Sequence, residues 1–97
     1  MFEIKENLNF GGAISALKHG HKVARKGWNG KGMFLTVQAG SVVNGTQMRN
    51  EHLKEYYGDK DVTIMPHIDM KAADDSLVVG WLASQTDMLA HDWCIVD

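Results

Sequence analysis

The sequence predicts an α+β domain in which an N-terminal helix packs on an antiparallel sheet of about five strands, with one or two additional short helices. Three observations predict this fold. Apolar residues recur at helical spacing near the N-terminus, short apolar runs alternate with turns that contain glycine or asparagine, and a capping box opens a short segment near the C-terminus. The 97 residues contain no repeat, low-complexity tract or linker, so we expect a single domain over residues 1–97.

The first predicted element is a helix that begins after Asn9, whose side chain suits an N-cap. Its apolar residues follow the i, i+3, i+4, i+7 spacing of one buried face, and they are Phe10, Ala13, Ile14 and Leu17. Gly20 is predicted to end the helix, because glycine readily takes the left-handed conformation that satisfies the last carbonyl groups.

Two strands are predicted next, at residues 21–26 and 33–38, and Val42-Val43 adds a few further strand residues. Between the first two strands lies the segment Trp28-Asn29-Gly30-Lys31, which contains Asn-Gly, the strongest short pattern for a hairpin turn. We therefore expect a turn at this segment.

The middle of the chain is strongly polar. A helix is predicted from Met48 to Tyr57, with Leu53 and either Tyr56 or Tyr57 facing inward. The alternative for this segment is a mobile insertion. Residues 62–65 and 67–70 then form a predicted strand with Pro66 in its middle, which requires an edge position, a bulge or a break in the strand.

The C-terminal elements follow a turn at residues 72–76. Leu77-Val78-Val79 leads into Trp81, and the capping box formed by Ser84 and Asp87 predicts a short helix from Gln85 to about Ala90. So short a helix is marginal by itself, and we expect it to be held by packing on neighbouring apolar residues, which are Trp81, Leu82, Met88, Leu89 and Trp93. The run Trp93-Cys94-Ile95-Val96 predicts a final strand.

Charge and hydropathy restrict the possible partners. Ten lysines and arginines against twelve aspartates and glutamates give a formal net charge of −2. The protein therefore lacks the basic field that attracts a nucleic-acid backbone, and we expect no duplex nucleic acid as a partner. No segment approaches the run of about 20 apolar residues that spans a bilayer, and the charged N-terminus does not resemble a signal peptide. We expect a cytosolic protein without a membrane partner. Seven basic residues between Lys18 and Lys31 suit a small anionic ligand or, alternatively, a solvated face.

Residues with catalytic or metal-binding chemistry are present, but their spacing is not diagnostic. His67 and Asp69 alternate on one strand face, and Asp87, His91 and Asp92 form a second group. Neither group has the ligand number or spacing of a zinc or calcium site, and no nucleophile elbow accompanies them. The single cysteine, Cys94, lies in an apolar strand and is expected to be buried and inert. We assign no catalytic residue, metal or cofactor.

The segment from Arg25 to Met33 has chemistry that fits a nucleotide. Its three glycines allow close backbone approach, Trp28 offers a face for a purine, and Asn29 can bind a base edge or a ribose hydroxyl. The segment lacks the spacing of a Walker loop or a dinucleotide fingerprint. A hairpin turn with a tryptophan packed beneath it is the alternative explanation.

Three runs together resemble a known family of phage and prophage proteins, Thoeris anti-defence two. The runs are residues 24–33, residues 66–71 and, most specifically, residues 81–93. The resemblance covers nearly the whole chain, including the helix after Asn9, and the polar stretch from Asn44 to Asp61 departs from it.

The resemblance implies a sponge that is not an enzyme. Members of that family sequester the cyclic ADP-ribose isomer made by the TIR enzyme of a bacterial immune system, so the expected place of action is the cytosol of the bacterial host. The resemblance also implies a homotetramer with ligand pockets between protomers and, in some members, a separate site for cyclic dinucleotides. The alternatives are an enzyme that cleaves a nucleotide and a phage structural or interaction module.

The residues can be given roles in such a sponge. Trp28 is the candidate for stacking on adenine. The candidates for polar contacts are Asn29, Asp69, Gln85 and Asp87, and the candidates for phosphate are Arg25, Lys31 and the helix start Ser84-Gln85-Thr86. Met33 and Met70 are the candidates for apolar walls. His67 is grouped with Asp69, whose strand face it shares. For Asp87 the capping box offers a structural role instead.

Overall fold

The computed structural model describes residues 5–28 and 30–97 and confirms the predicted α+β fold. Within these described residues, three short α-helices accompany a five-stranded sheet and a separate two-stranded sheet. The elements in chain order are α1 (Phe10–Lys18), β1 (Val23–Arg25), β2 (Phe34–Gln38), β3 (Ser41–Asn44), the 3-10 turn η1 (Gly45–Gln47), α2 (Glu51–Tyr57), β4 (Asp61–Ile64), β5 (His67–Lys71), β6 (Leu77–Val79), α3 (Gln85–Leu89) and β7 (Trp93–Ile95).

The five-stranded sheet has the order β6-β5-β2-β1-β7, and every pairing in it is antiparallel. One face carries the core, because Val23, Leu35 and Trp93 are fully buried there and pack against α1. Side chains alternate along a strand, so Ala24, Phe34 and Cys94 point to the opposite face, which we call the open face. The remaining buried core residues are Ala13, Ala16, Leu17 and Met70.

The ends of α1 follow the sequence pattern. The Asn9 side chain accepts from the backbone N–H of Gly12 at 2.8 Å, as predicted for an N-cap. Gly20 has a φ of +90°, and its N–H donates to the Leu17 carbonyl at 3.0 Å. The left-handed conformation expected of this glycine is therefore confirmed.

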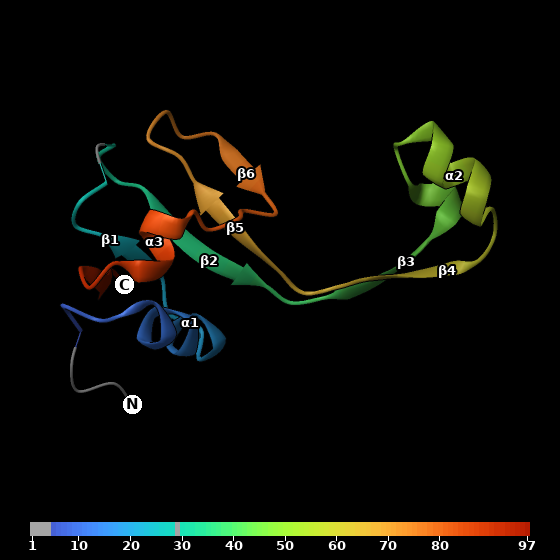
Figure 1. Cartoon of the computed structure of the whole chain (residues 1–97). Helices are drawn as coiled ribbons and strands as arrows, with labels where there is room; N and C mark the ends of the chain where they lie inside the picture. Colours follow the sequence, from blue (N-terminus) through green and yellow to red (C-terminus); the bar gives the residue numbers. More distant parts are fainter. Residues whose placement is uncertain (1–4, 29) are drawn as a thin grey trace.

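A long hairpin leaves the body of the protein and forms a projecting arm, which we define as residues 41–64 (Figure 1). The register of its strands continues that of the sheet: Gln38 pairs with His67, and Ser41 pairs with Ile64. Of the three possibilities for Pro66, the structure has the strand break, because proline has no N–H to donate to the ladder. The arm lengthens the molecule to 47 Å and raises its radius of gyration to 16.1 Å, against about 12–13 Å for a compact chain of this size.

The helix at the tip of the arm corrects one prediction. Asn50 caps α2 by accepting from the N–H of Leu53 at 3.1 Å, so a helix forms here. However, Leu53 is 44% exposed and Tyr56 is 79% exposed. The expectation that Leu53 faces inward was wrong, because the arm carries its helix away from the core. Of the two tyrosines that were alternatives, Tyr56 is exposed and Tyr57 is half-buried.

The two edges of the sheet differ. Along β7, Leu8 and Trp93 exchange backbone hydrogen bonds, and Ile95 donates to the Lys5 carbonyl, so the chain itself covers this edge. Along β6, the side chains of Leu77, Val78 and Val79 are all exposed. Within residues 5–28 and 30–97, no helix has both the length and the apolar character needed to cross a membrane.

Candidate functional site

Three tryptophans gather beside the helix face of the sheet, where they anchor the C-terminal segment. Trp28 and Trp93 have ring centroids 5.3 Å apart, and Trp81 lies 6.3 Å from each of them. All three contacts are edge-to-face, the arrangement that aromatic quadrupoles favour. The two indoles that flank α3 in the sequence are thus brought onto the indole of the β1–β2 connection, and they fix where α3 lies.

Asp87 is the polar centre of this cluster. Its Oδ1 accepts from Arg25 Nη1 at 2.8 Å and from Trp28 Nε1 at 3.2 Å. Its backbone carbonyl accepts from Trp93 Nε1 at 2.9 Å. The capping box predicted for α3 is also present, since Ser84 Oγ accepts from the Asp87 N–H and Asp87 Oδ2 accepts from the Ser84 N–H. One residue therefore joins the start of α3 to an arginine and two tryptophans.

Arg25 lies between two carboxylates. Its Nε donates to Asp92 Oδ1 at 2.8 Å, while its Nη1 holds Asp87. Hydrogen bonds to Asp92 and then Asp87 raise the pKa of Arg25, and the bond from Arg25 lowers the pKa of Asp92. Burial raises the pKa of Asp87, but hydrogen bonds from Arg25, Trp28 and Ser84 outweigh this effect and leave it lowered. The network keeps both carboxylates ionised at neutral pH.

A cavity of about 350 Å³ opens beside this network, and we call it the open-face cavity. It brings together three of the sequence-predicted site residues, Arg25, Trp28 and Met33. The other lining residues are Ala24, Lys26, Gly30, Gly32, Phe34, Cys94 and Val96. The lining thus includes two aromatic residues, two basic residues and two glycines.

Small residues create the hollow. Ala24 and Cys94 are cross-strand partners on the open face, and neither side chain is large enough to fill it. Gly30 is needed for close packing, because a Cβ at this position would lie 2.7 Å from the Cβ of Ala73. Lys71 Nζ donates to the Gly32 carbonyl at 3.1 Å and ties the β1–β2 connection to β5. Burial raises the pKa of the Cys94 thiol, in agreement with the expected inert cysteine.

His67 and Asp69 lie apart from this cavity. His67 Nε2 is 3.6 Å from Asp69 Oδ1, and the backbone N–H of Gly80 donates to the same oxygen at 3.1 Å. Asp69 is only 1% exposed. Met70, predicted as an apolar wall, belongs to the buried core.

The remaining predicted residues differ in their surroundings. Lys31 is exposed in the β1–β2 connection, and Ser84, Gln85 and Thr86 are exposed at the start of α3. Asn29 lies outside the described residues. Among residues 5–28 and 30–97, no group of three or more histidine, cysteine, aspartate or glutamate side chains is placed to hold a metal ion.

The sequence interpretation missed Phe34 and Val96 as cavity walls, and it considered Asp92 only as part of a possible acid-base group. Strand alternation offered a way to find Phe34, since it shares a face with Ala24 and Cys94 once the strands are paired. The pairing of Arg25 with Trp93 places Asp92 within reach of the guanidinium, and that register was not evident beforehand.

The protein is a small α+β domain, with one face of its sheet hollowed near a tryptophan cluster. Residues 8–96 match the family model of the Thoeris anti-defense 2-like domain, and this match spans the polar stretch that the resemblance had left out. The chain is also 34% identical over 93 residues to Thoeris anti-defense 2 of Bacillus phage SP01, covering 96% of this chain and 99% of that protein. The chain belongs to the Thoeris anti-defense 2 family, as its sequence motifs predicted, and its role is anti-defence.

Proposed function

We propose that this protein binds and sequesters a cyclic ADP-ribose isomer, the signal of the Thoeris immune system, and that it does not alter the ligand. The observation that carries this proposal is the open-face cavity, in which aromatic rings, cations and glycine backbone converge. Its volume of about 350 Å³ falls within the usual range for small-molecule sites, which is about 300–1,000 Å³.

Each part of the cavity suits one part of a nucleotide. Trp28 and Phe34 offer apolar ring surface for adenine, and Met33 and Val96 supply aliphatic walls. Gly30 and Gly32 allow a sugar or phosphate to approach the backbone closely. Lys26, which is half exposed and paired with Glu6 across 3.2 Å, supplies positive charge for the pyrophosphate. Lys31 adds a second cation from the same connection.

Arg25 has a different task in this proposal. Two carboxylates already offset its charge, so its contribution is to hold Trp28 and α3 in place as well as to border the ligand. Asp87 acts in the same way through the indole N–H of Trp28. Gln85 and Thr86, exposed on α3 beside Asp87, are proposed to reach polar groups of the ligand.

Sequestration rather than turnover fits the chemistry of the cavity. Its side chains are aromatic, aliphatic and cationic, together with a thiol whose pKa burial raises, and such a set supplies affinity. General acid-base catalysis requires a titratable group within hydrogen-bond reach of the reacting atoms. The pair that could serve, His67 and Asp69, is engaged with Met65 and Gly80 at the start of β5.

Self-association is the second part of the proposal. The exposed edge strand β6 is wholly apolar, and Leu82, just beyond it, is 89% exposed. Uncovered apolar edges invite pairing with another chain. We propose a homotetramer in the cytosol of the bacterial host, in which a neighbouring protomer completes each nucleotide pocket and leaves more of the ligand enclosed. His67, Asp69 and Met70 would then support β5 beneath the neighbouring strand.

Isothermal titration of the purified protein with cyclic ADP-ribose isomers tests the proposal. We expect saturable binding to one isomer, and we expect Phe34→Ala to weaken it at least tenfold while the oligomer and the melting temperature of the free protein change little. The matched control is Tyr56→Ala on the arm, an exposed aromatic far from the cavity, which should bind as the parent does. Equal loss in both variants, or binding that Phe34→Ala leaves intact, would contradict a site at the open-face cavity.

A further inference from the structure

The connection between β1 and β2, residues 26–33, supplies much of the open-face cavity. Trp28, Gly30, Gly32 and Met33 line the cavity, and all four belong to this connection. A connection of this kind has no ladder or helix of its own to fix it, so its shape depends on the contacts that other parts of the chain make with it. The affinity of the cavity therefore depends on what holds the connection.

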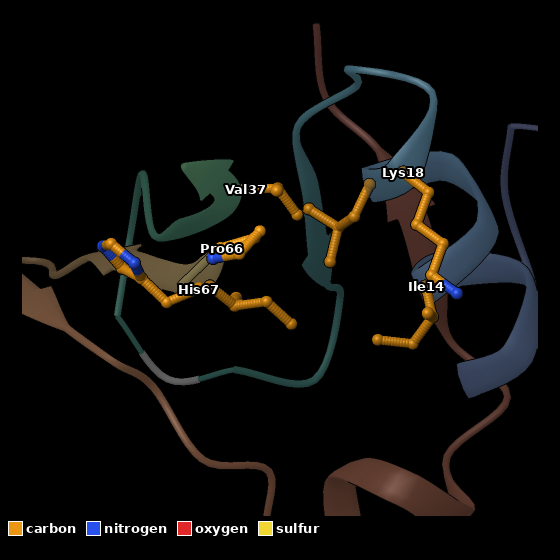
Figure 2. A pocket seen from close by; sticks show the side chains of 7 residues that line it. Ile14, Lys18, Val37, Pro66 and His67 are labelled. Atoms are coloured by element: carbon orange, nitrogen blue, oxygen red, sulfur yellow. The ribbon is translucent and has the colours of Figure 1, made fainter. Parts of the chain in front are cut away.

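A hollow of about 210 Å³ on the helix side of the sheet is built differently (Figure 2). Ile14 borders it from α1 and Val37 borders it from β2, and both residues belong to elements with regular backbone hydrogen bonds. Such walls hold their shape without further contacts. In contrast, no described residue of the β1–β2 connection belongs to a helix or strand, so this wall of the open-face cavity needs other support.

Asp92 holds the start of the connection. This residue precedes β7, and its backbone carbonyl accepts from the N–H of Lys26 at 3.1 Å, one step beyond the pairing of Arg25 with Trp93. Its carboxylate accepts from the N–H of Gly27 at 2.7 Å through Oδ2, and from Arg25 Nε at 2.8 Å through Oδ1. One aspartate thus binds three consecutive residues where β1 ends and the connection begins.

Gly27 fits this contact because it has no side chain. A Cβ at this position would lie 2.7 Å from Asp92 Oδ2 and 3.2 Å from Arg25 Nη2, closer than ordinary van der Waals contact. The carboxylate therefore lies directly against the backbone of Gly27. A larger residue at this position would push the carboxylate away from the N–H that it binds.

The rest of the connection is also held from outside. Asp87 Oδ1 accepts from Trp28 Nε1, and Lys71 Nζ donates to the Gly32 carbonyl at 3.1 Å. Asp92 itself does not line the cavity, and both of its carboxylate oxygens are engaged. An ionised carboxylate repels a pyrophosphate, so a direct contact with a nucleotide would oppose binding. The part of Asp92 in binding is therefore indirect.

We propose that Asp92 is a positioning residue for the nucleotide: it fixes the start of the β1–β2 connection in the shape of the open-face cavity before the ligand arrives. This inference rests on the proposed function, because the affinity that Asp92 supports is affinity for the cyclic nucleotide. Without the carboxylate the connection takes several shapes, and only the fraction of molecules with the shape of the cavity binds. A connection that is already ordered removes this cost from the binding step.

Backbone amide relaxation, measured by NMR on the isotope-labelled free protein, tests the positioning itself. Asp92→Asn keeps the size of the side chain but has one oxygen for two separate donors, Arg25 and Gly27. The order parameters of residues 26–32 should therefore fall from about 0.85 toward about 0.6, and the cyclic ADP-ribose isomer should restore them. Order parameters that stay as high as in the parent would overturn the proposal.

Asp97→Asn is the matched control. Asp97 also accepts from a backbone N–H, that of Lys22 at 2.7 Å, but it does so just before β1 and not at the connection. This variant should leave residues 26–32 as ordered as they are in the parent. Equal loss of order in Asp97→Asn and Asp92→Asn would mean that the loosening is general, which contradicts a specific role for Asp92.

Stopped-flow tryptophan fluorescence separates positioning from direct contact with the ligand. In Asp92→Asn the association rate constant should fall about five- to tenfold, because fewer free molecules have the shape that binds. The dissociation rate constant should stay close to that of the parent, because the bound connection has the same shape in both proteins. A variant that only dissociates faster has lost a direct contact instead, and this result would exclude a positioning role.

Gly27→Ala tests the same contact from its other side, and it serves if Asp92→Asn does not fold. Its methyl group displaces the carboxylate, so it should reproduce both the mobility and the slower association. The double variant should bind no more weakly than either single variant, and additive losses would contradict the proposal. If the parent binds no cyclic ADP-ribose isomer, the proposed function fails and this inference fails with it. If the parent binds and Asp92→Asn associates as fast, only this inference fails.

Discussion

Asp87 Oδ1 accepts hydrogen bonds from Arg25 Nη1, at 2.8 Å, and from Trp28 Nε1, at 3.2 Å. One carboxylate oxygen therefore ties the start of α3 to β1 and to the indole that borders the open-face cavity. The five-residue helix has no buried residue, so this contact and the tryptophan cluster are what hold it. The position of Trp28, which lines the cavity, therefore depends on its hydrogen bond to Asp87.

Loss of the Asp87 carboxylate should destabilise the fold. Asp87→Ala leaves Arg25 with only Asp92 and leaves the Trp28 N–H without an acceptor, which should lower the free energy of unfolding by about 1–3 kcal/mol. Asp87→Asn retains an oxygen acceptor and should cost less. Urea unfolding measures both, and Glu55→Gln on the exposed face of α2 should stay within about 0.5 kcal/mol of the parent. An Asp87→Ala variant as stable as Glu55→Gln would show that the contact is not needed.

Acid should remove the same stabilisation. Asp87 and Asp92 have lowered pKa values in the folded protein, so the unfolded chain takes up protons first as the pH falls. Their contribution is fully present above the unfolded value of about 4 and is lost as the pH falls through the lower folded values. Urea unfolding at pH 7 and at pH 3 should therefore show a stability gap between the parent and Asp92→Asn that narrows at pH 3. A stability difference between the parent and Asp92→Asn that is larger at pH 3 than at pH 7 would contradict the lowered pKa values.

The indole of Trp28 should contribute to nucleotide binding in two separable ways. Trp28→Phe keeps a ring but loses the Nε1 donor to Asp87, and Trp28→Ala loses the stacking surface as well. Stacking of a base on an aromatic side chain is worth about 1–3 kcal/mol, so the alanine variant should bind the signal about five- to 150-fold more weakly, with phenylalanine between it and the parent. Calorimetric titration gives the order, and a phenylalanine variant weaker than the alanine variant would exclude a stacking role.

The bend between the body and the arm should depend on Gly40. A Cβ at this position would lie 2.6 Å from the Ile64 carbonyl oxygen, which is backbone and cannot move aside. Gly40→Ala should therefore speed amide hydrogen exchange in β3 and β4 while β1 keeps its protection. Gly11→Ala is the matched control, because its Cβ would meet only Asn9 Oδ1 at 3.5 Å within a helix, where alanine is preferred. Equal rates of amide hydrogen exchange in the two variants would mean that Gly40 and the Ile64 carbonyl do not stay in close contact.

The edge of β6 should mediate self-association. Val79→Lys and Leu82→Lys place charges on an exposed apolar surface and should lower the mass measured by light scattering, without lowering the helix and strand content. Val42→Lys, on the arm, alters a residue that is 64% exposed and should leave the mass unchanged. If only Val42→Lys lowers the mass, the interface between protomers lies on the arm and not at β6.

Local patterns in the sequence predicted most of the fold. The helix ends were predicted from capping residues, which are Asn9, Gly20 and the pair of Ser84 and Asp87. Capping hydrogen bonds join residues that are close in the sequence, so they depend little on the rest of the structure. Pro66 indicated an edge position, a bulge or a strand break, and the structure has the break. These features depend on residues that are close in the sequence, so they can be predicted from one sequence.

Long-range relations were not predictable in the same way. The arm arises because β3 and β4 continue the register of β2 and β5 past a break. That register is fixed only when residues 17 to 37 positions apart in the chain pair. The polar composition of residues 44–61 was consistent with a helix, yet it did not show that Leu53 would lie far from the core. Likewise, Asp92 joins Arg25 across 67 positions of sequence, and Phe34 meets Ala24 and Cys94 only through strand pairing.

Recovery of the ligand after binding tests the central claim most directly. The protein is incubated with the cyclic ADP-ribose isomer that it binds, freed of excess ligand, denatured, and the released small molecule is identified by liquid chromatography and mass spectrometry. If the protein is a sponge, the same isomer returns unchanged, in a fixed ratio to protomers that does not fall with longer incubation. Release of a linear or cleaved nucleotide, increasing with time, would contradict the account and assign an enzyme instead.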